Sequence, residues 1–331
     1  MIEPLAVLVG PTAVGKTAIS LPVAEALRAE VLNVDSRQLY RYMDIGTAKP
    51  TRAQRHRIPH HLLDLLTPDE RSTAAQFMGV ARQVVDEVQA RGKRVLVVAG
   101  SGLYLQALLY GLMPAPSAHE PLRVALRARA DLEGPLELHR WLSRLDPELA
   151  TQYHPNDRIR LVRALEVILL TGEPFSVHRQ RHEAQDARYP YIAVGLTRDQ
   201  TDLHDRIARR TEAMLAAGWL AETERLVAQG YTRSCTAMNS LGYRELLSYL
   251  EGQSTWHDAV QAIGKATRLL AKRQLTWFRK LPHLSWLNLS HLDEQTAVSH
   301  ILERFQGVNA PKGTTMPRLC THDSSDRKGR L

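Results

Sequence analysis

The stretch GPTAVGKT, residues 10–17, decides the fold. Gly10, Gly15, Lys16 and Thr17 fit the pattern G-x-x-x-x-G-K-[ST]. In that pattern backbone N–H groups wrap phosphate oxygens, the Lys neutralises them and the hydroxyl binds Mg²⁺. The apolar run 5–9 predicts a buried strand before the loop, and residues 18–27 predict a helix after it, whose N-terminus favours anions. The sequence therefore predicts a phosphate-binding loop, and the phosphates could belong to ATP, GTP or another diphosphate.

Further segments of the sequence predict that this loop belongs to an open sheet. Apolar runs at 31–34, 60–66 and 94–100 predict more strands, and residues 73–90 have helical spacing. Alternating strands and helices imply right-handed crossovers, with ligands at the carboxyl ends of the strands, where Asp35 and Ser101 lie. We therefore expect an α/β fold, a P-loop-type open parallel sheet flanked by helices.

The pattern changes to helices only between about residues 114 and 188. One of these helices is expected to begin at Asn156 or Asp157 and to end near Gly172. The apolar run 191–197 returns to strand character. We expect a catalytic core of residues 1–116 and 189–306, an all-helical insertion at 117–188, and a tail at 307–331 whose Pro, Gly, Ser and charge content predicts disorder.

Composition narrows the class of protein. The 331 residues carry a formal net charge of +8, which favours a polyanionic partner such as nucleic acid. The two cysteines, Cys235 and Cys320, are too few for a disulfide framework or a Cys-rich zinc site, which suits a reducing cytoplasm. The first residues lack the basic region of a signal peptide, and no uncharged apolar run is long enough to span a bilayer, so we expect no membrane partner.

A basic stripe is predicted on a helix late in the chain. At 100° per residue the stripe contains Lys265, Arg268, Lys272 and Arg279. Nearly opposite lie Ile263, Leu270, Trp277 and Leu281. We expect the basic stripe to meet nucleic acid and the opposite face to be buried. The alternative is an ordinary solvated face, which the absence of Asp and Glu between residues 259 and 281 disfavours.

The strand-end residues argue against a nucleotide hydrolase. An ATPase or GTPase needs a second strand-end carboxylate beside the loop to hold Mg²⁺, but the run 95–98 is followed by Ala99, Gly100 and Ser101. No N-K-x-D stretch is present to read guanine. Asp35 is the one carboxylate on the correct side, and the polar residues after it suit a polar substrate; a helix N-cap is the alternative for Asp35.

Eight segments, in order along the chain, carry a resemblance. They are GPTAVGKT (10–17), DSRQLYRYMDIGTAKPT (35–51), PHHLLD (59–64), AGSGLY (99–104), HPNDRIRLVRALEV (154–167), RIARR (206–210), GYRE (242–245) and TRLLAKRQLTWFRK (267–280). Together they resemble the bacterial tRNA dimethylallyltransferases, also called tRNA isopentenyltransferases. The similarity runs to about residue 306, and the second segment is highly specific.

The resemblance implies an activity. The chain would transfer a dimethylallyl group from dimethylallyl diphosphate to N6 of the adenosine immediately 3′ of the anticodon, in tRNAs that read codons beginning with U, and release diphosphate. Its implied partners are the tRNA anticodon stem-loop and the prenyl donor, with Mg²⁺ as cofactor and no obligate protein partner, so we expect a monomer. Two alternatives stay open: a P-loop small-molecule kinase with Asp35 as base, and a nucleotide-switched nucleic-acid binder.

The resemblance also implies roles for individual residues. Asp35 would take a proton from the amine or orient it, and the charge of the leaving diphosphate would be met by Lys16, Arg210 and Ser101. The donor would lie on Gly10, Pro11, Thr12, Ala13, Val14, Gly15, Lys16 and Thr17, with Thr17 also on Mg²⁺. Implied tRNA contacts, with the basic stripe included, are Asp35, Ser36, Arg37, Gln38, Ser101, Arg123, Ile159, Arg160, Leu161, Val162, Arg163, Gly242, Tyr243, Arg244, Lys265, Arg268, Lys272 and Arg279.

One segment departs from the family pattern. The family has Gly-Gly-Thr where this chain has Ala99, Gly100 and Ser101. Ser101 keeps the hydroxyl and loses the methyl, while Ala99 adds a methyl where close backbone approach matters. Because the hydroxyl is retained, we expect activity to survive this change.

Overall fold

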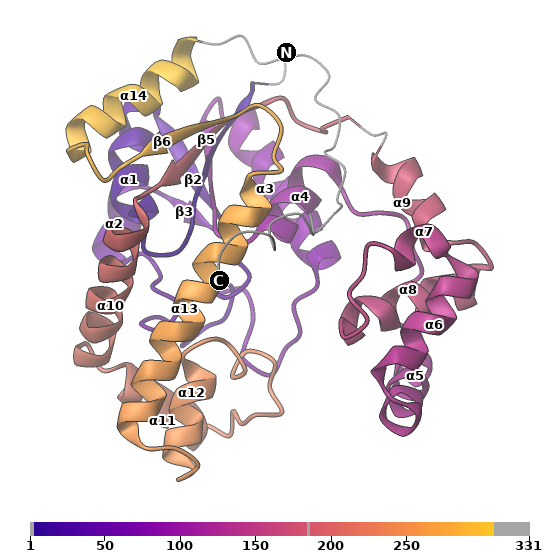
Figure 1. Cartoon of the computed structure of the whole chain (residues 1–331). Coiled ribbons are helices and arrows are strands. Elements are labelled where there is room, and N and C mark those ends of the chain that lie inside the picture. The colour runs from indigo at the N-terminus through magenta and orange to yellow at the C-terminus, as the bar shows by residue number, and fades with distance from the viewer. Residues whose placement is uncertain (1–2, 184–185, 308–331) are drawn as a thin grey trace, which may run out of the picture. The chain divides into compact units, whose positions relative to one another are not determined.

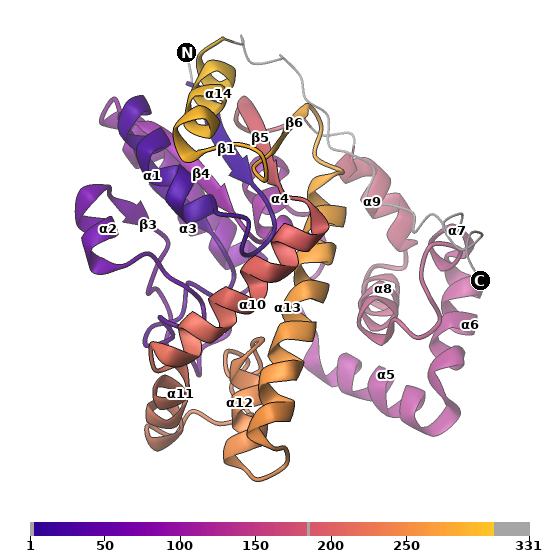
Figure 2. The ribbon, with the colours of Figure 1, turned by 60° about the vertical axis from the view of Figure 1, so that its left-hand side comes forward.

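The computed structural model describes residues 3–183 and 186–307, so the predicted tail beyond Gly307 lies outside the described residues. The chain forms two compact units (Figures 1 and 2). Of the described residues, one unit combines those up to Gly111 with 187–307, and the other contains those from Leu112 to Asp186, where the sequence predicts an insertion at 117–188. No helix of the described residues is long and apolar enough to cross a membrane.

The first unit is built on a parallel sheet. Six strands in the order β3-β2-β4-β1-β5-β6 are β1 (Leu5–Val9), β2 (Ala29–Val34), β3 (His60–His61), β4 (Arg94–Ala99), β5 (Tyr191–Thr197) and β6 (Leu284–Asn288). Every pairing is parallel, and Ala99 is in register with both Val9 and Val34. The α/β fold class is confirmed, and the carboxyl ends of β1, β2 and β4 meet at one edge.

Helices cover both faces of the sheet. One face carries α1 (Lys16–Leu27) and α14 (Glu294–Gly307), and the other carries α3 (Ala74–Ala90) and α4 (Gly102–Tyr110) (Figure 2). The helix α2 (Arg52–Arg57) precedes β3. Beyond β5 the chain forms α10 (Gln200–Ala216), α11 (Trp219–Ala228), α12 (Tyr243–Leu250) and α13 (Trp256–Phe278). The strand run 5–9 is fully buried, as its unbroken apolar sequence predicts.

Two strand predictions are corrected. The expected strand at 60–66 stops at His61, because Leu62 and Asp64 have positive φ of 64° and 56°, which extended backbone does not allow. Asp64 instead pairs with Lys49 at 2.6 Å and with Arg55 at 2.6 Å. The sequence patterns missed β6, a partly exposed edge strand without a continuous apolar run.

The second unit is all helical. It contains α5 (Glu120–Glu133), α6 (Pro135–Leu145), α7 (Pro147–Ala150), α8 (Arg158–Thr171) and α9 (Phe175–Glu183) around its own apolar core. Asp157 caps α8 by accepting a hydrogen bond from the N–H of Arg160, and Gly172 ends the helix with a φ of 74°. Of the two N-cap residues that the sequence allows, the structure uses Asp157.

Candidate active site

The phosphate loop has the geometry its sequence predicts. Gly15 is the N-cap of α1 with a φ of 113°, and a Cβ at Gly10 would lie 2.8 Å from the carbonyl oxygen of Leu196 in β5. Larger residues are therefore excluded at both positions. The Lys16 Nζ donates to the carbonyl oxygens of Gly10 at 2.7 Å and Pro11 at 2.8 Å, so the ammonium lies over the loop where a phosphate would bind.

The charge on Lys16 is adjustable. Burial, and next the nearby Arg210, lower the pKa of Lys16 to about 7, while the Asp35 carboxylate acts in the opposite direction. Burial likewise lowers the pKa of Arg210, against the effect of Asp35. A bound dianion would favour the charged form of both side chains, so this end of the site is suited to a diphosphate.

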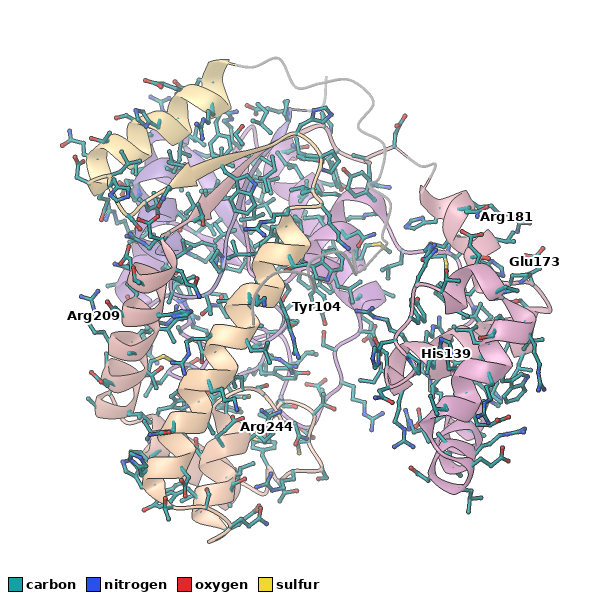
Figure 3. All side chains as sticks on the ribbon, in the orientation of Figure 1. Tyr104, His139, Glu173, Arg181, Arg209 and Arg244 are labelled. Carbon is teal, nitrogen blue, oxygen red and sulfur yellow. The ribbon has the colours of Figure 1, made fainter. Side chains whose placement is uncertain are left out.

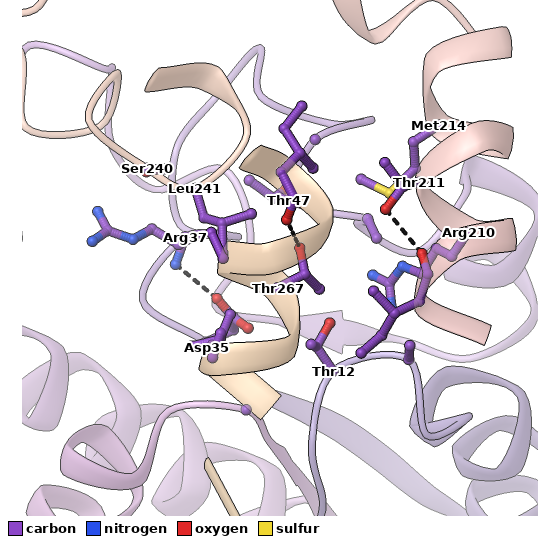
Figure 4. Close-up of a pocket in the computed structure, with 18 of the residues that line it drawn as sticks. Thr12, Asp35, Arg37, Thr47, Arg210, Thr211, Met214, Ser240, Leu241 and Thr267 are labelled. Carbon is purple, nitrogen blue, oxygen red and sulfur yellow. Dashed lines mark hydrogen bonds between the residues drawn. The ribbon is translucent and has the colours of Figure 1, made fainter. Parts of the chain in front are cut away.

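A cavity of about 1030 Å³ opens from the phosphate loop. Its walls come from the loop after β2, the turn after β4, and helices α10 and α13, all within the first unit (Figure 4). Asp35 and Thr12 lie at the lower end of the view in Figure 4, with Arg210 and Met214 on α10 at one side and Thr267 on α13. Phosphate-binding, acidic and apolar groups therefore share one space.

Asp35 is held by its own turn. Its Oδ1 accepts hydrogen bonds from the N–H groups of Arg37 at 2.8 Å and Gln38 at 3.4 Å. No helix starts in this turn, so the N-cap alternative for Asp35 is wrong. The other oxygen, Oδ2, lies beside Gly100, where an added Cβ would come within 2.8 Å, and no donor among the described residues binds it. Asp35 therefore keeps one oxygen for a ligand.

Ser101 links the ends of β4 and β2. Its Oγ accepts from the N–H of Ser36 at 3.0 Å and donates to the Ser36 Oγ at 3.3 Å. The hydroxyl makes no capping bond to α4, although Ser101 occupies the N-cap position. The Ser101 hydroxyl therefore lies at the cavity wall, where it orients Ser36, the residue after Asp35.

Replacing Ser101 tests its hydroxyl. We expect Ser101→Thr to keep most activity and Ser101→Ala to lose on the order of ten- to a thousand-fold in turnover, as for one lost charge-stabilising donor. Steady-state kinetics on an RNA stem-loop measure this. Alanine turning over as fast as serine would show that the hydroxyl has no part in the reaction.

Three residues hold the phosphate loop in place, a role that the sequence does not predict for them. Gln274 of α13 accepts from the N–H of Thr12 at 2.8 Å and donates to the carbonyl of Gly100 at 2.8 Å, so it joins the loop to the end of β4. Arg206 and Arg198 donate to the carbonyl oxygens of Ala13 at 3.1 Å and Val14 at 2.9 Å. Arg206 and Gln274 belong to the segments RIARR and TRLLAKRQLTWFRK, which carry the family resemblance, whereas Arg198 lies outside those segments.

The basic stripe is only partly as predicted. Lys265, Arg268, Lys272 and Arg279 are exposed, with Arg279 at the C-cap of α13. On the opposite side Ile263 is buried, but Leu270 is 37% exposed and lines the cavity. Trp277 is half-buried against Gly102, where a Cβ would lie 2.5 Å from its ring. The face expected to be buried borders the cavity, because α13 forms one of its walls.

The arginines of the helical unit are engaged with a buried carboxylate. Glu166 is fully buried, and it accepts from Arg123 at 2.9 and 3.0 Å and from Arg163 at 2.6 Å. Arg160 is exposed and lies over the Tyr153 ring, 5.7 Å from its centroid. Ile159 is 85% exposed. These side chains lie on α5 and α8.

Three of the residues predicted to contact RNA have buried side chains. Leu161 and Val162 are 0% and 5% exposed in the core of the helical unit, because they lie on the inner side of α8, so their side chains are not available to RNA. Tyr243 is also fully buried, and its hydroxyl donates to Glu222. By contrast Arg244, labelled on α12 in Figure 3, is half-exposed and pairs with Glu245.

Comparison with known proteins agrees with this geometry. The family model described as IPP transferase matches residues 38–281. The chain is 44% identical over 301 residues to tRNA dimethylallyltransferase 2 of Geotalea uraniireducens, covering 91% of this chain and 97% of the relative. The chain belongs to the IPP transferase family. The resemblance seen in the eight segments is therefore confirmed.

Other members of the IPP transferase family agree along most of their length. The tRNA dimethylallyltransferase of Symbiobacterium thermophilum is 47% identical over 289 residues, covering 87% of this chain and 90% of the relative. The crystal structure of the full-length tRNA isopentenylpyrophosphate transferase of Bacillus halodurans matches with a TM-score of 0.70 at 37% identity, covering 92% and 96% of the two chains. A eukaryotic dimethylallyltransferase acting on tRNA matches with a TM-score of 0.78 at 25% identity, covering 95% and 82%.

Proposed function

We propose that this IPP transferase moves the dimethylallyl group of dimethylallyl diphosphate to N6 of the adenosine immediately 3′ of the anticodon, in tRNAs that read codons beginning with U. The observation that carries the proposal is one cavity with a phosphate loop and the uncommitted Asp35 Oδ2. The products would be N6-(dimethylallyl)adenosine and diphosphate. A cytoplasmic location and a monomeric state go with this function as predictions.

The phosphate loop would hold the donor's diphosphate. Its backbone N–H groups, with Lys16 and Arg210, offer positive charge where the bond from carbon to oxygen breaks and negative charge grows on the leaving group. Preorganised donors of this kind stabilise the transition state more than the ground state, because the charge they meet is larger there.

Residues in the cavity fit a Mg²⁺ ion shared with the donor. Mg²⁺ takes few protein ligands and usually keeps phosphate oxygens and waters, so the Thr17 hydroxyl beside the phosphate loop suits it. Among the described residues no group of three His, Cys, Asp or Glu could hold a metal by itself, which fits a site completed by the substrate. The ion would supply Lewis-acid neutralisation of the diphosphate.

Asp35 would accept the proton that the N6 amine loses. As N6 forms its bond to the dimethylallyl carbon, the C–O bond to diphosphate breaks and N6 must lose one proton. The Oδ2 oxygen takes this proton, while Oδ1 stays bound to the N–H groups of Arg37 and Gln38. The turn therefore fixes the carboxylate and leaves one oxygen to accept the proton.

The proposal has a direct test. Anticodon stem-loop RNA is incubated with the protein, Mg²⁺ and dimethylallyl diphosphate, and the RNA is digested to nucleosides for mass spectrometry. We expect a dimethylallyl group on one adenosine, next to the anticodon. Phosphorylation of a small molecule by ATP, with no prenylated nucleoside, would favour the kinase alternative instead.

The basic stripe gives a prediction about RNA binding. If Lys265 and Lys272 meet RNA phosphates, replacing both by Gln should weaken stem-loop binding and reduce the slope of log affinity against log salt by about 1.4 to 1.8, the loss of two phosphate contacts. Binding titrations between low and moderate salt measure the slope. An unchanged slope would remove these residues from the RNA interface.

A further inference from the structure

Glu222 is a buried carboxylate that the proposed chemistry does not use. It lies on α11, and the residue is 3% exposed. Its Oε2 accepts from the N–H groups of Asp44 at 3.0 Å and Ile45 at 2.9 Å. Its Oε1 accepts from the N–H of Gly46 at 3.1 Å and from the Tyr243 hydroxyl at 2.6 Å. A buried charge is tolerated only when it is satisfied in this way.

The packing around Glu222 joins two segments that line the cavity. A Cβ at Gly46 would lie 2.0 Å from the Trp219 Nε1, and a Cβ at Gly242 would lie 1.9 Å from the Trp219 ring. Trp219 also packs edge-on against Tyr243, with ring centroids 5.7 Å apart. The loop at 44–46 and the segment at 242–243 are thus both fastened to α11.

The two residues that follow the loop at 44–46 are hydrogen-bonded to the side chain of Gln38. The Gln38 Nε2 donates to the carbonyl oxygens of Thr47 and Ala48, each at 3.2 Å. An amide NH₂ has two protons, so both donors of this side chain are used. What Gln38 can still offer to a group in the cavity is its Oε1, which only accepts hydrogen bonds. Thr47, Ala48 and Gln38 all line the cavity.

We infer that Glu222 is a positioning residue for RNA recognition: it fixes the backbone at 44–46, and the carbonyls that follow orient Gln38 so that its Oε1 faces an amino group of a base. This inference rests on the proposed function, since it needs RNA in the cavity. The Gln38 Oε1 would favour a base with an exocyclic amine over a base that presents a carbonyl at the same place. In the second case two hydrogen-bond acceptors would face each other.

Tyr243 supports the same arrangement from the other side. Burial, and next the charge of Glu222, raise the pKa of Tyr243 well above its ordinary value. The phenol therefore stays protonated and donates to Glu222 throughout the usual pH range. The Tyr243 hydroxyl adds one hydrogen bond to the three that the Glu222 carboxylate accepts from the backbone.

The test compares Glu222→Gln with Gln38→Ala and with the double variant. A glutamine keeps the shape but turns one acceptor into a donor. The new NH₂ faces either the Gly46 N–H and the Tyr243 hydroxyl or the N–H groups of Asp44 and Ile45, so at least one hydrogen bond is lost. We expect the KM for stem-loop RNA to rise about tenfold or more, the scale of one lost buried hydrogen bond, while the KM for dimethylallyl diphosphate stays within about twofold.

A second readout separates positioning from general support of the fold. The nucleoside immediately 5′ of the target is an adenosine in these tRNAs, because it pairs with the U that begins the codon. In the stem-loop it is replaced by purine riboside, which lacks the amino group. We expect the wild type to prefer adenosine over purine riboside at this position by about tenfold, and Glu222→Gln to reduce this preference to less than about threefold. In the double variant Gln38→Ala should add little, since both changes remove the same contact.

Controls make the outcomes distinct. Glu224 is exposed on the same helix, so Glu224→Gln should behave as wild type. Tyr243→Phe removes only the 2.6 Å hydrogen bond and gives a milder variant in case Glu222→Gln does not fold. Equal losses for both substrates, additive effects with Gln38→Ala, or unchanged base preference would overturn the inference. Absence of prenylated RNA with the wild type would instead contradict the proposed function itself.

Discussion

Asp35→Asn is expected to bind both substrates and to transfer the prenyl group about a hundred- to ten-thousand-fold more slowly, the usual scale for a positioned base. The asparagine oxygen still accepts from the N–H groups of Arg37 and Gln38, so the turn keeps its shape. The amide nitrogen that replaces Oδ2 cannot take a proton from N6. Single-turnover transfer should collapse, while RNA affinity and the KM for the donor stay within a few-fold of wild type.

Protection of the phosphate loop from proteolysis, measured with dimethylallyl diphosphate and with ATP, tests which donor the loop binds. If the phosphate loop is made for the prenyl donor, dimethylallyl diphosphate should protect it from proteolysis better than ATP does. Protection by ATP and not by the prenyl donor would support a kinase. Prenyl transfer by Asp35→Asn at the wild-type rate would show that another group, or the leaving diphosphate itself, takes the proton.

Sequence patterns predict correctly those elements whose structure depends on residues close together along the chain. The run 5–9, the glycines of GPTAVGKT and the cap at Asp157 each follow from a few neighbouring residues, and the structure has them in place. The strand expected at 60–66 ends at His61, where Leu62 and Asp64 have positive φ and Asp64 pairs with Lys49 and Arg55. An apolar run does not reveal where such a turn falls.

The sequence patterns do not predict contacts between segments that lie far apart along the chain. Gln274 meets Thr12 across 262 positions, and Glu222 meets Gly46 across 176. A single glutamine or glutamate within a helix has an ordinary sequence pattern, so its burial emerges only when the fold brings the partners together. Leu161 and Val162, which the family resemblance places among the RNA contacts, lie in the core of the helical unit.

Lys16 governs the opposite half of the reaction from Asp35. Lys16→Met removes a charge that meets the diphosphate in both the ground state and the transition state, so donor affinity and turnover should both fall. One lost charge-assisted contact in a water-excluded site corresponds to about a hundred- to thousand-fold in turnover. Stem-loop affinity should stay near wild type, which separates this variant from one that has lost its fold.

Protonation of Lys16 gives a second, independent measurement. With a pKa of about 7 in the ligand-free protein, Lys16 is about one-tenth charged at pH 8 and about nine-tenths charged at pH 6. A bound diphosphate raises that pKa, so donor binding should take up more protons on Lys16 at pH 8, where less of it is charged beforehand, than at pH 6. Calorimetry in buffers of different ionisation enthalpy counts these protons, and the difference between wild type and Lys16→Met removes the donor's own titration. Equal proton uptake by the two proteins at pH 8 would mean that Lys16 is already charged before the donor arrives, and that its ammonium is a fixed part of the loop instead of a group charged by its ligand.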